Sequence, residues 1–62
     1  MTKEEIIALC IVGGVPYMQE QGKHDNRMIY RINIAGWKRL EFDEDLAWNK
    51  AWDAYAKLGE FK

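Results

Sequence analysis

Apolar positions recur with the period of a helix near the start of this 62-residue chain. The stripe consists of Ile6, Ile7, Cys10 and Ile11. This three- and four-residue spacing is typical of the buried face of a helix. Thr2 followed by Glu5 is a capping-box pattern, while Gly13, Gly14 and Pro16 mark a helix end. The pattern predicts a helix over about residues 3–12.

A second helical stripe occupies the last third of the chain. It consists of Ala47, Trp48, Ala51, Ala54, Tyr55 and Leu58, with Trp52 at its edge. Asp43 or Asp45 can cap the first turn, where acidic side chains suit the helix dipole. Gly59 is placed to end the helix, and Phe61 lies beyond it, where its ring can fold back onto the core.

Between the two helices the apolar period changes from that of a helix to that of a strand. Residues 27–34 alternate, with one face formed by Met28, Tyr30, Ile32 and Ile34 and the other by Arg27, Arg31 and Asn33, with Ile29 as the exception. Residues 22–26 form a turn cluster, and residues 15–21 are expected to be an edge strand because Pro16 cannot lie within a central one.

The connection after Ile34 sets the register of the next strand, and its length has two alternatives. A two-residue turn at Ala35-Gly36 pairs Ile32 with Arg39, which mixes charges into the apolar face. A loop of three or five residues pairs Tyr30 with Phe42, Ile32 with Leu40 and Arg31 with Glu41. The second register separates an apolar face from a polar one, so it is preferred, and it places Trp37 at the loop tip.

These elements predict a single α+β domain over residues 1–62. Its order is α-β-β-β-α, or α-β-β-α if residues 15–21 form no strand, with a small antiparallel sheet packed against two helices. The simplest packing covers one face of the sheet with both helices, and the alternative places one helix on each face. A chain this short buries only about 60% of its unfolded surface, so a partner chain would add useful stability.

Charge is unevenly distributed along the chain, although the formal net charge is only −1. Residues 23–39 have five basic and one acidic side chain, whereas residues 40–62 have six acids and three lysines. The apolar run 6–12 is too short to span a bilayer and no basic leader precedes it, so a cytoplasmic protein without membrane contact is expected.

The residue types that support catalysis or metal binding are sparse. Cys10 lies on an apolar stripe with no base near it in sequence, and His24 stands beside Asp25 in a turn. The acids 43–45 are explained by a helix N-terminus. With one histidine and one cysteine, the chain has no pair of such residues at ligand spacing, so a structural zinc site is not expected. We therefore expect no enzyme, no metal and no cofactor.

The basic side chains of the central strands are the best candidates for a binding site. The candidate partner-binding residues are Trp37, Lys38, Arg39, Arg31, Arg27 and Trp52. Arginine and tryptophan dominate protein interfaces, which favours a protein partner and allows a homodimer. The second alternative is a nucleic-acid-binding module, because the basic strand face of Arg27, Arg31, Lys38 and Arg39 also suits phosphates and base stacking. A solvated face with Arg31 neutralised by Glu41 needs no partner at all.

Two families resemble parts of this sequence. The α-β-β-β-α order with "PY", "GKH" and an alternating strand resembles the double-stranded RNA-binding domain, whose second helix begins with lysines; the matching positions here are Asp43, Glu44 and Asp45. "DEDLAW" and "KAW" are similar to small phage and prophage proteins of helix–sheet–helix type. That second resemblance implies an accessory protein that binds a host component.

Overall fold

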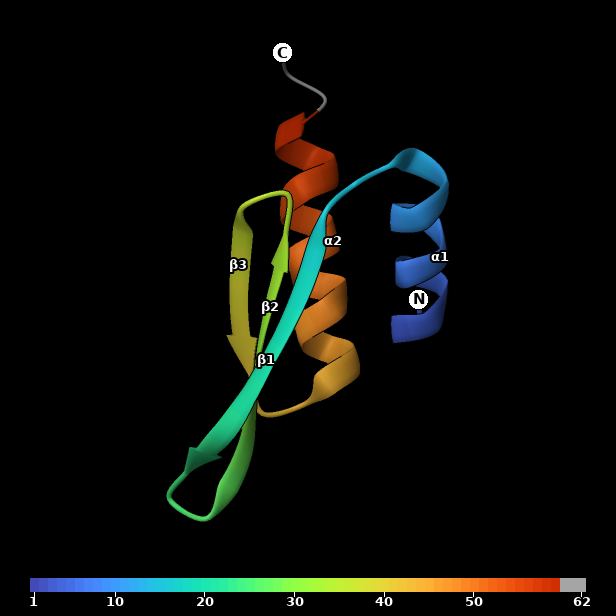
Figure 1. Cartoon of the computed structure of the whole chain (residues 1–62). Coiled ribbons are helices and arrows are strands. Elements are labelled where there is room, and N and C mark those ends of the chain that lie inside the picture. Colours follow the sequence, from blue (N-terminus) through green and yellow to red (C-terminus); the bar gives the residue numbers. More distant parts are fainter. Residues whose placement is uncertain (60–62) are drawn as a thin grey trace.

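A three-stranded sheet lies between the two helices in sequence, as predicted. The computed structural model describes residues 1–59, and for Leu58 and Gly59 it describes the backbone alone, so the expectations for the Leu58 and Phe61 side chains lie outside it. The elements are α1 (Lys3–Gly13), β1 (Tyr17–His24), β2 (Arg27–Ile34), β3 (Trp37–Glu41) and α2 (Glu44–Gly59), as Figure 1 shows. The α+β class is confirmed. The strand expected over residues 15–21 is present but spans residues 17–24, so residues 22–24 belong to the strand and not to the predicted turn.

Local signals in the sequence determine where both helices begin and where α1 ends. Thr2 and Glu5 form the reciprocal capping box of α1, and Gly14 ends that helix in the left-handed conformation with φ of 66°. At the start of α2, the Asp43 carboxylate accepts a hydrogen bond from the Leu46 N–H at 2.9 Å. Asp43 is therefore the cap that the sequence offered as one of two choices.

The sheet has the order β1-β2-β3, and both connections are antiparallel two-residue hairpin turns. The first turn is Asp25-Asn26, with φ of 52° and 64°. The second is Ala35-Gly36, with φ of 52° and 92°. Positive φ at both central residues matches the right-handed twist of the flanking strands. The Gly36 N–H also donates to the Asn33 side chain at 2.8 Å, which stabilises the second turn.

The preferred register of β3 was wrong. Ile34 pairs with Trp37, Ile32 with Arg39 and Tyr30 with Glu41, which is the register of the rejected two-residue turn. Trp37 is consequently the first residue of a strand and not a loop tip. The expected Arg31–Glu41 ion pair is also absent from the described ion pairs, because Arg31 faces Glu20 at 3.6 Å and Glu41 binds Lys50 at 2.7 Å.

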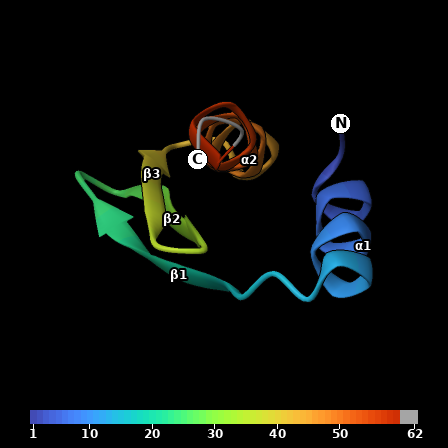
Figure 2. The ribbon, with the colours of Figure 1, turned by 90° about the horizontal axis from the view of Figure 1, so that it is seen from above.

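Both helices lie on one side of the sheet, which we call the closed side (Figure 2). α2 packs across β2 and β3, while α1 packs mainly against α2. The core is small and consists of Ile6, Cys10, Ile32, Ile34, Ala47, Trp48 and Ala51. Trp48 is a core residue as predicted, and Cys10 is fully buried. Trp52 packs at the edge of this core, 5.4 Å from the ring of Tyr55.

The first hairpin is longer than the rest of the sheet. β3 pairs only with residues 30–34 of β2, so the pairs Gly22–Ile29, Lys23–Met28 and His24–Arg27 form a two-stranded arm. The arm extends below the body of the molecule in Figure 1. It gives the domain a long dimension of 39 Å against 21 Å and 17 Å for the others.

Candidate functional site

The face of the sheet opposite the helices, which we call the open face, is not covered by any helix or strand of the described chain (Figure 2). Strand alternation places there Met18, Glu20 and Gly22 of β1, Arg27, Ile29, Arg31 and Asn33 of β2, and Lys38, Leu40 and Phe42 at β3. Leu40 is 49% exposed and Phe42 is 40% exposed. Two residues expected in the core therefore lie on the surface.

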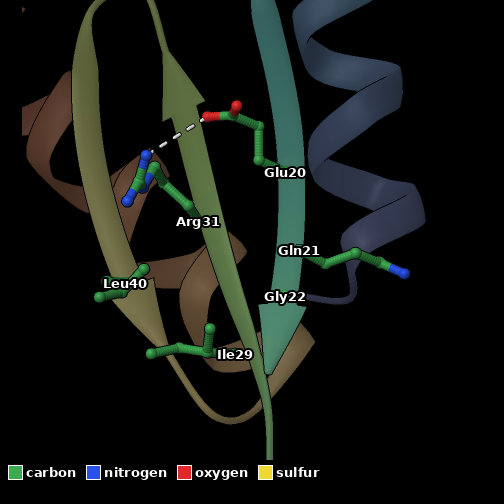
Figure 3. A pocket seen from close by; sticks show the side chains of 6 residues that line it. All are labelled: Glu20, Gln21, Gly22, Ile29, Arg31 and Leu40. Carbon is green, nitrogen blue, oxygen red and sulfur yellow. Dashed lines mark ion pairs between the residues drawn. The ribbon is translucent and has the colours of Figure 1, made fainter. Parts of the chain in front are cut away.

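A shallow hollow of 210 Å³ lies on the open face. It is lined by Glu20, Gln21, Gly22, Ile29, Arg31 and Leu40 (Figure 3). Gly22 pairs with Ile29 and has no side chain, and a Cβ built on it would meet nothing within 4 Å. The missing side chain at Gly22 thus opens the hollow beside Ile29. A glycine within a strand was the available sequence signal for this feature.

Basic groups surround these apolar side chains. The Arg27 guanidinium lies 4.0 Å from the centroid of the Phe42 ring, within the range of a cation–π contact. Arg31 reaches towards Glu20 at 3.6 Å, as Figure 3 shows. Lys38 is the third cation of the open face, and Glu20 is the one acid among the described strand residues there. Three positive charges against one negative charge leave this face with a net charge of +2.

The closed side contains a polar network that the sequence did not reveal. The Gln19 Oε1 accepts the indole N–H of buried Trp48 at 2.8 Å, and Gln19 Nε2 donates to Glu44 at 2.7 Å. Lys3 adds an ion pair to the same carboxylate at 3.1 Å. These contacts, led by the hydrogen bond from Gln19, hold the pKa of Glu44 below its ordinary value. The network joins α1, β1 and α2.

The structure divides the six candidate partner-binding residues among three places. Arg27, Arg31 and Lys38 lie on the open face, as described above. Trp37 and Arg39 belong to the closed side, because their partners Ile34 and Ile32 are buried beneath the helices. Trp37 remains 37% exposed at the end of the sheet, and Arg39 lines a cleft with α2 residues.

Trp52, the sixth candidate, lies on α2 and is half-buried against the core. One flat contact surface therefore includes at most the first group of three. Leu40, Phe42 and Ile29 are the functional candidates that sequence analysis missed on that surface, since the register determines where they point.

The three acids considered for catalysis make structural hydrogen bonds. Asp43 caps α2, Glu44 belongs to the Gln19 network, and the Asp45 carboxylate accepts the Lys3 backbone N–H at 3.0 Å. His24 stands exposed on the arm, 3.5 Å from Asp25. Burial raises the pKa of the Cys10 thiol, which disfavours the reactive thiolate.

The described part of the chain offers no group of three or more histidine, cysteine or acidic residues that could hold a metal ion. No helix within residues 1–59 has both the length and the apolar character needed to cross a membrane.

Comparison of this chain with protein-family models, with curated proteins and with solved structures found no match.

Proposed function

We propose that this chain is a small non-catalytic binding protein whose open face docks on an acidic partner protein. The observation that supports this proposal is a set of apolar side chains, exposed Leu40 and Phe42 with half-buried Ile29, on a sheet face that no described element covers. Soluble domains rarely expose contiguous apolar side chains without a binding role. An apolar centre surrounded by polar and charged side chains is typical of a protein interface.

The chemistry of this face indicates what the partner should present. The hollow beside Gly22 and Ile29 is open and apolar at its base, so it suits one apolar anchor side chain. The net charge of +2 favours acidic groups around that anchor and disfavours a second copy docking face to face. The similarity to small phage proteins would make this partner a host protein.

A nucleic acid is the second candidate, because Arg27, Arg31 and Lys38 share one strand face. To bind the backbone of a nucleic acid, the protein would need these cations to contact its phosphates. The acids at the start of α2 work against the binding mode implied by the resemblance to the double-stranded RNA-binding domain, since Asp43, Glu44 and Asp45 stand where that family has lysines. The protein partner is therefore the primary proposal.

Two variants of the open face test the proposal without disturbing the core. Gly22→Thr fills the hollow at a position where φ is not positive and the added Cβ meets no atom. Leu40→Ser removes apolar surface. The matched control is Leu46→Ser on α2, because Leu46 is 43% exposed and lies outside the open face.

The experiment immobilises wild type and the three variants, captures proteins from the source cell, and repeats the capture after nuclease treatment. The expected result is a protein retained by wild type and Leu46→Ser but lost with Gly22→Thr and Leu40→Ser. Its affinity is then measured with purified components. Identical captured sets for all four chains would contradict the proposal, and capture abolished by nuclease would favour the nucleic-acid reading.

A further inference from the structure

β1 has a free outer edge whose backbone groups can be assigned residue by residue. The Ala35 N–H donates to the Pro16 carbonyl at 2.8 Å, so positions 16 and 35 form a hydrogen-bonded pair. The two-residue turn at Asp25-Asn26 independently makes His24 and Arg27 such a pair. Hydrogen-bonded pairs alternate along an antiparallel ladder. The even-numbered residues of β1 therefore bond to β2.

The odd-numbered residues of β1 consequently point their N–H and C=O groups away from the sheet. These residues are Tyr17, Gln19, Gln21 and Lys23. None of them has a backbone partner among the hydrogen bonds of the described chain outside its own helices and strands. An edge of this length is a template for pairing with another extended chain.

A groove of 390 Å³ runs along this edge on the closed side. It is lined by Lys3 and Ile7 of α1, by Tyr17, Met18, Gln19 and Gln21 of β1, and by Trp48 at its base. The Gln19 amide donates to Glu44 and Gln21 and accepts from Trp48, so its side chain is held in these hydrogen bonds and does not reach across the groove. α1 flanks the groove opposite β1, which leaves space for the side chains of one added strand.

We infer that the β1 edge pairs with the β1 edge of a second copy of this chain. A two-fold axis perpendicular to the sheet makes the two β1 strands antiparallel and joins the sheets into one of six strands. The axis must pass through a residue facing its own copy. This pairing keeps all four helices on one side and joins the two open faces into one surface.

The side chains select the residue on the axis. With Glu20 on the axis, two carboxylates face each other, which is unfavourable. With Gln21 on the axis, Gln21 faces Gln21, Gln19 faces Lys23, and Glu20 faces Gly22, so no like charges are opposed. With Gly22 on the axis the paired segments are shorter. Gln21 is therefore the assigned centre, and Lys23 of the second copy enters the groove beside Gln19.

The proposal is tested first by the mass of wild type. Sedimentation should show a species near twice the chain mass of 7.3 kDa as the concentration is raised. Amide hydrogen exchange at high concentration should protect the Gln19, Gln21 and Lys23 N–H groups, and dilution should remove that protection. The even-numbered amides of β1 should remain protected at both concentrations, because β2 binds them.

One backbone variant separates edge pairing from other contacts. Gln21→Pro removes an outward N–H and no bond to β2, and edge strands tolerate proline at such positions. Each dimer loses two hydrogen bonds, so the dissociation constant should rise by about 10- to 100-fold. Gln21→Ala keeps the N–H, and Lys38→Pro makes the same change at the outer edge of β3, so both should dimerise like wild type.

Three results would overturn the inference. The first is a wild-type chain that stays monomeric up to about 1 mM. The second is exchange of the Gln19, Gln21 and Lys23 amides at the rate of turn amides in concentrated samples. The third is a Gln21→Pro variant that dimerises as tightly as wild type. The open-face proposal survives each of these results, because its variants lie on a different surface.

Discussion

Successive residues of β2 and β3 point alternately to the two faces of the sheet, yet the helices cover only one of these faces. On the closed side Ile32 and Ile34 are fully buried beneath the helices. On the open face Ile29, Leu40 and Phe42 are also apolar, but no described element packs on them. Both sides of this sheet thus offer apolar surface, and only one side is used for folding.

A hairpin turn can decide which apolar residues of a sheet lie on the surface. Had β3 shifted by one position, Leu40 and Phe42 would face the helices. The two-residue turn instead directs Arg39 and Glu41 to the closed side, where β3 contributes no residue to the core cluster. Glu41 is satisfied there by Lys50 of α2 at 2.7 Å. Because charged side chains are tolerated at this edge of the core, the register does not destabilise the fold.

The largest contrast is expected between two isoleucines on opposite faces of β2. Ile32→Ala leaves a cavity in a tightly packed core and should cost about 2–5 kcal/mol. A domain of this size has roughly 3–9 kcal/mol of stability in total, so this variant should be largely unfolded or close to it. Ile29→Ala on the open face should cost less than about 1 kcal/mol.

Urea unfolding followed by circular dichroism measures both isoleucine variants. Equal losses of stability for Ile32→Ala and Ile29→Ala would show that the open face is covered in the folded protein.

A second contrast tests how far the closed side depends on its polar network. Gln19→Ala leaves the buried Trp48 indole N–H without its acceptor and should cost about 1–3 kcal/mol. Gln21→Ala is the matched control on the same strand side, because Gln21 is exposed and only accepts one hydrogen bond from Gln19. Its effect should stay within about 0.5 kcal/mol. Thermal unfolding that ranks the two variants in reverse order would contradict the network.

The turn that sets the two sides can be strengthened. Ala35 has φ of 52°, a left-handed conformation that costs a non-glycine residue about 1–2 kcal/mol. Asn tolerates this conformation better, and Asn-Gly is the preferred pair for such a turn. Ala35→Asn should therefore raise stability by about 0.5–1 kcal/mol. Gly36→Ala should lower it, since Gly36 has φ of 92°. A destabilising Ala35→Asn substitution would argue for a different turn.

The smallest effect concerns the pH dependence of the closed side. The pKa of Glu44 is lowered in the folded chain, first by Gln19 and then by Lys3. A lowered pKa adds stability above the ordinary value of 4.5, and this stability is lost as the pH falls through the folded value. Glu44→Gln should weaken the fall in stability below pH 4.5. Parallel stability curves for wild type and Glu44→Gln would exclude a contribution from this ion pair.

Much of the fold could be predicted from local signals. Thr2 and Glu5 define the start of α1, Gly14 ends it, and Asp43 caps α2 because each signal acts within a few residues. The strand of residues 27–34 was equally clear from its alternation. These predictions are confirmed since capping and periodicity depend little on tertiary contacts.

The candidate site could be predicted only in part, because it depends on register. Arg27 and Arg31 were placed correctly on one face of β2, where the alternation within a single strand suffices. Leu40 and Phe42 were assigned to the core because the preferred register aligned them with Ile32 and Tyr30 to give one apolar and one polar face. Ala35 also lacks the usual signature of a two-residue turn, so the hairpin could not be recognised from its residues.

The central claim is the register that exposes Leu40, and cross-strand proton contacts test it most directly. In a two-residue hairpin the pair Ile34–Trp37 is hydrogen-bonded, so Arg31 and Leu40 form a pair without hydrogen bonds. The α-protons of such a pair are close, and a nuclear Overhauser spectrum should show a strong Arg31 Hα–Leu40 Hα cross-peak. A cross-peak between Ile32 Hα and Leu40 Hα in its place would contradict the register and return Leu40 to the core.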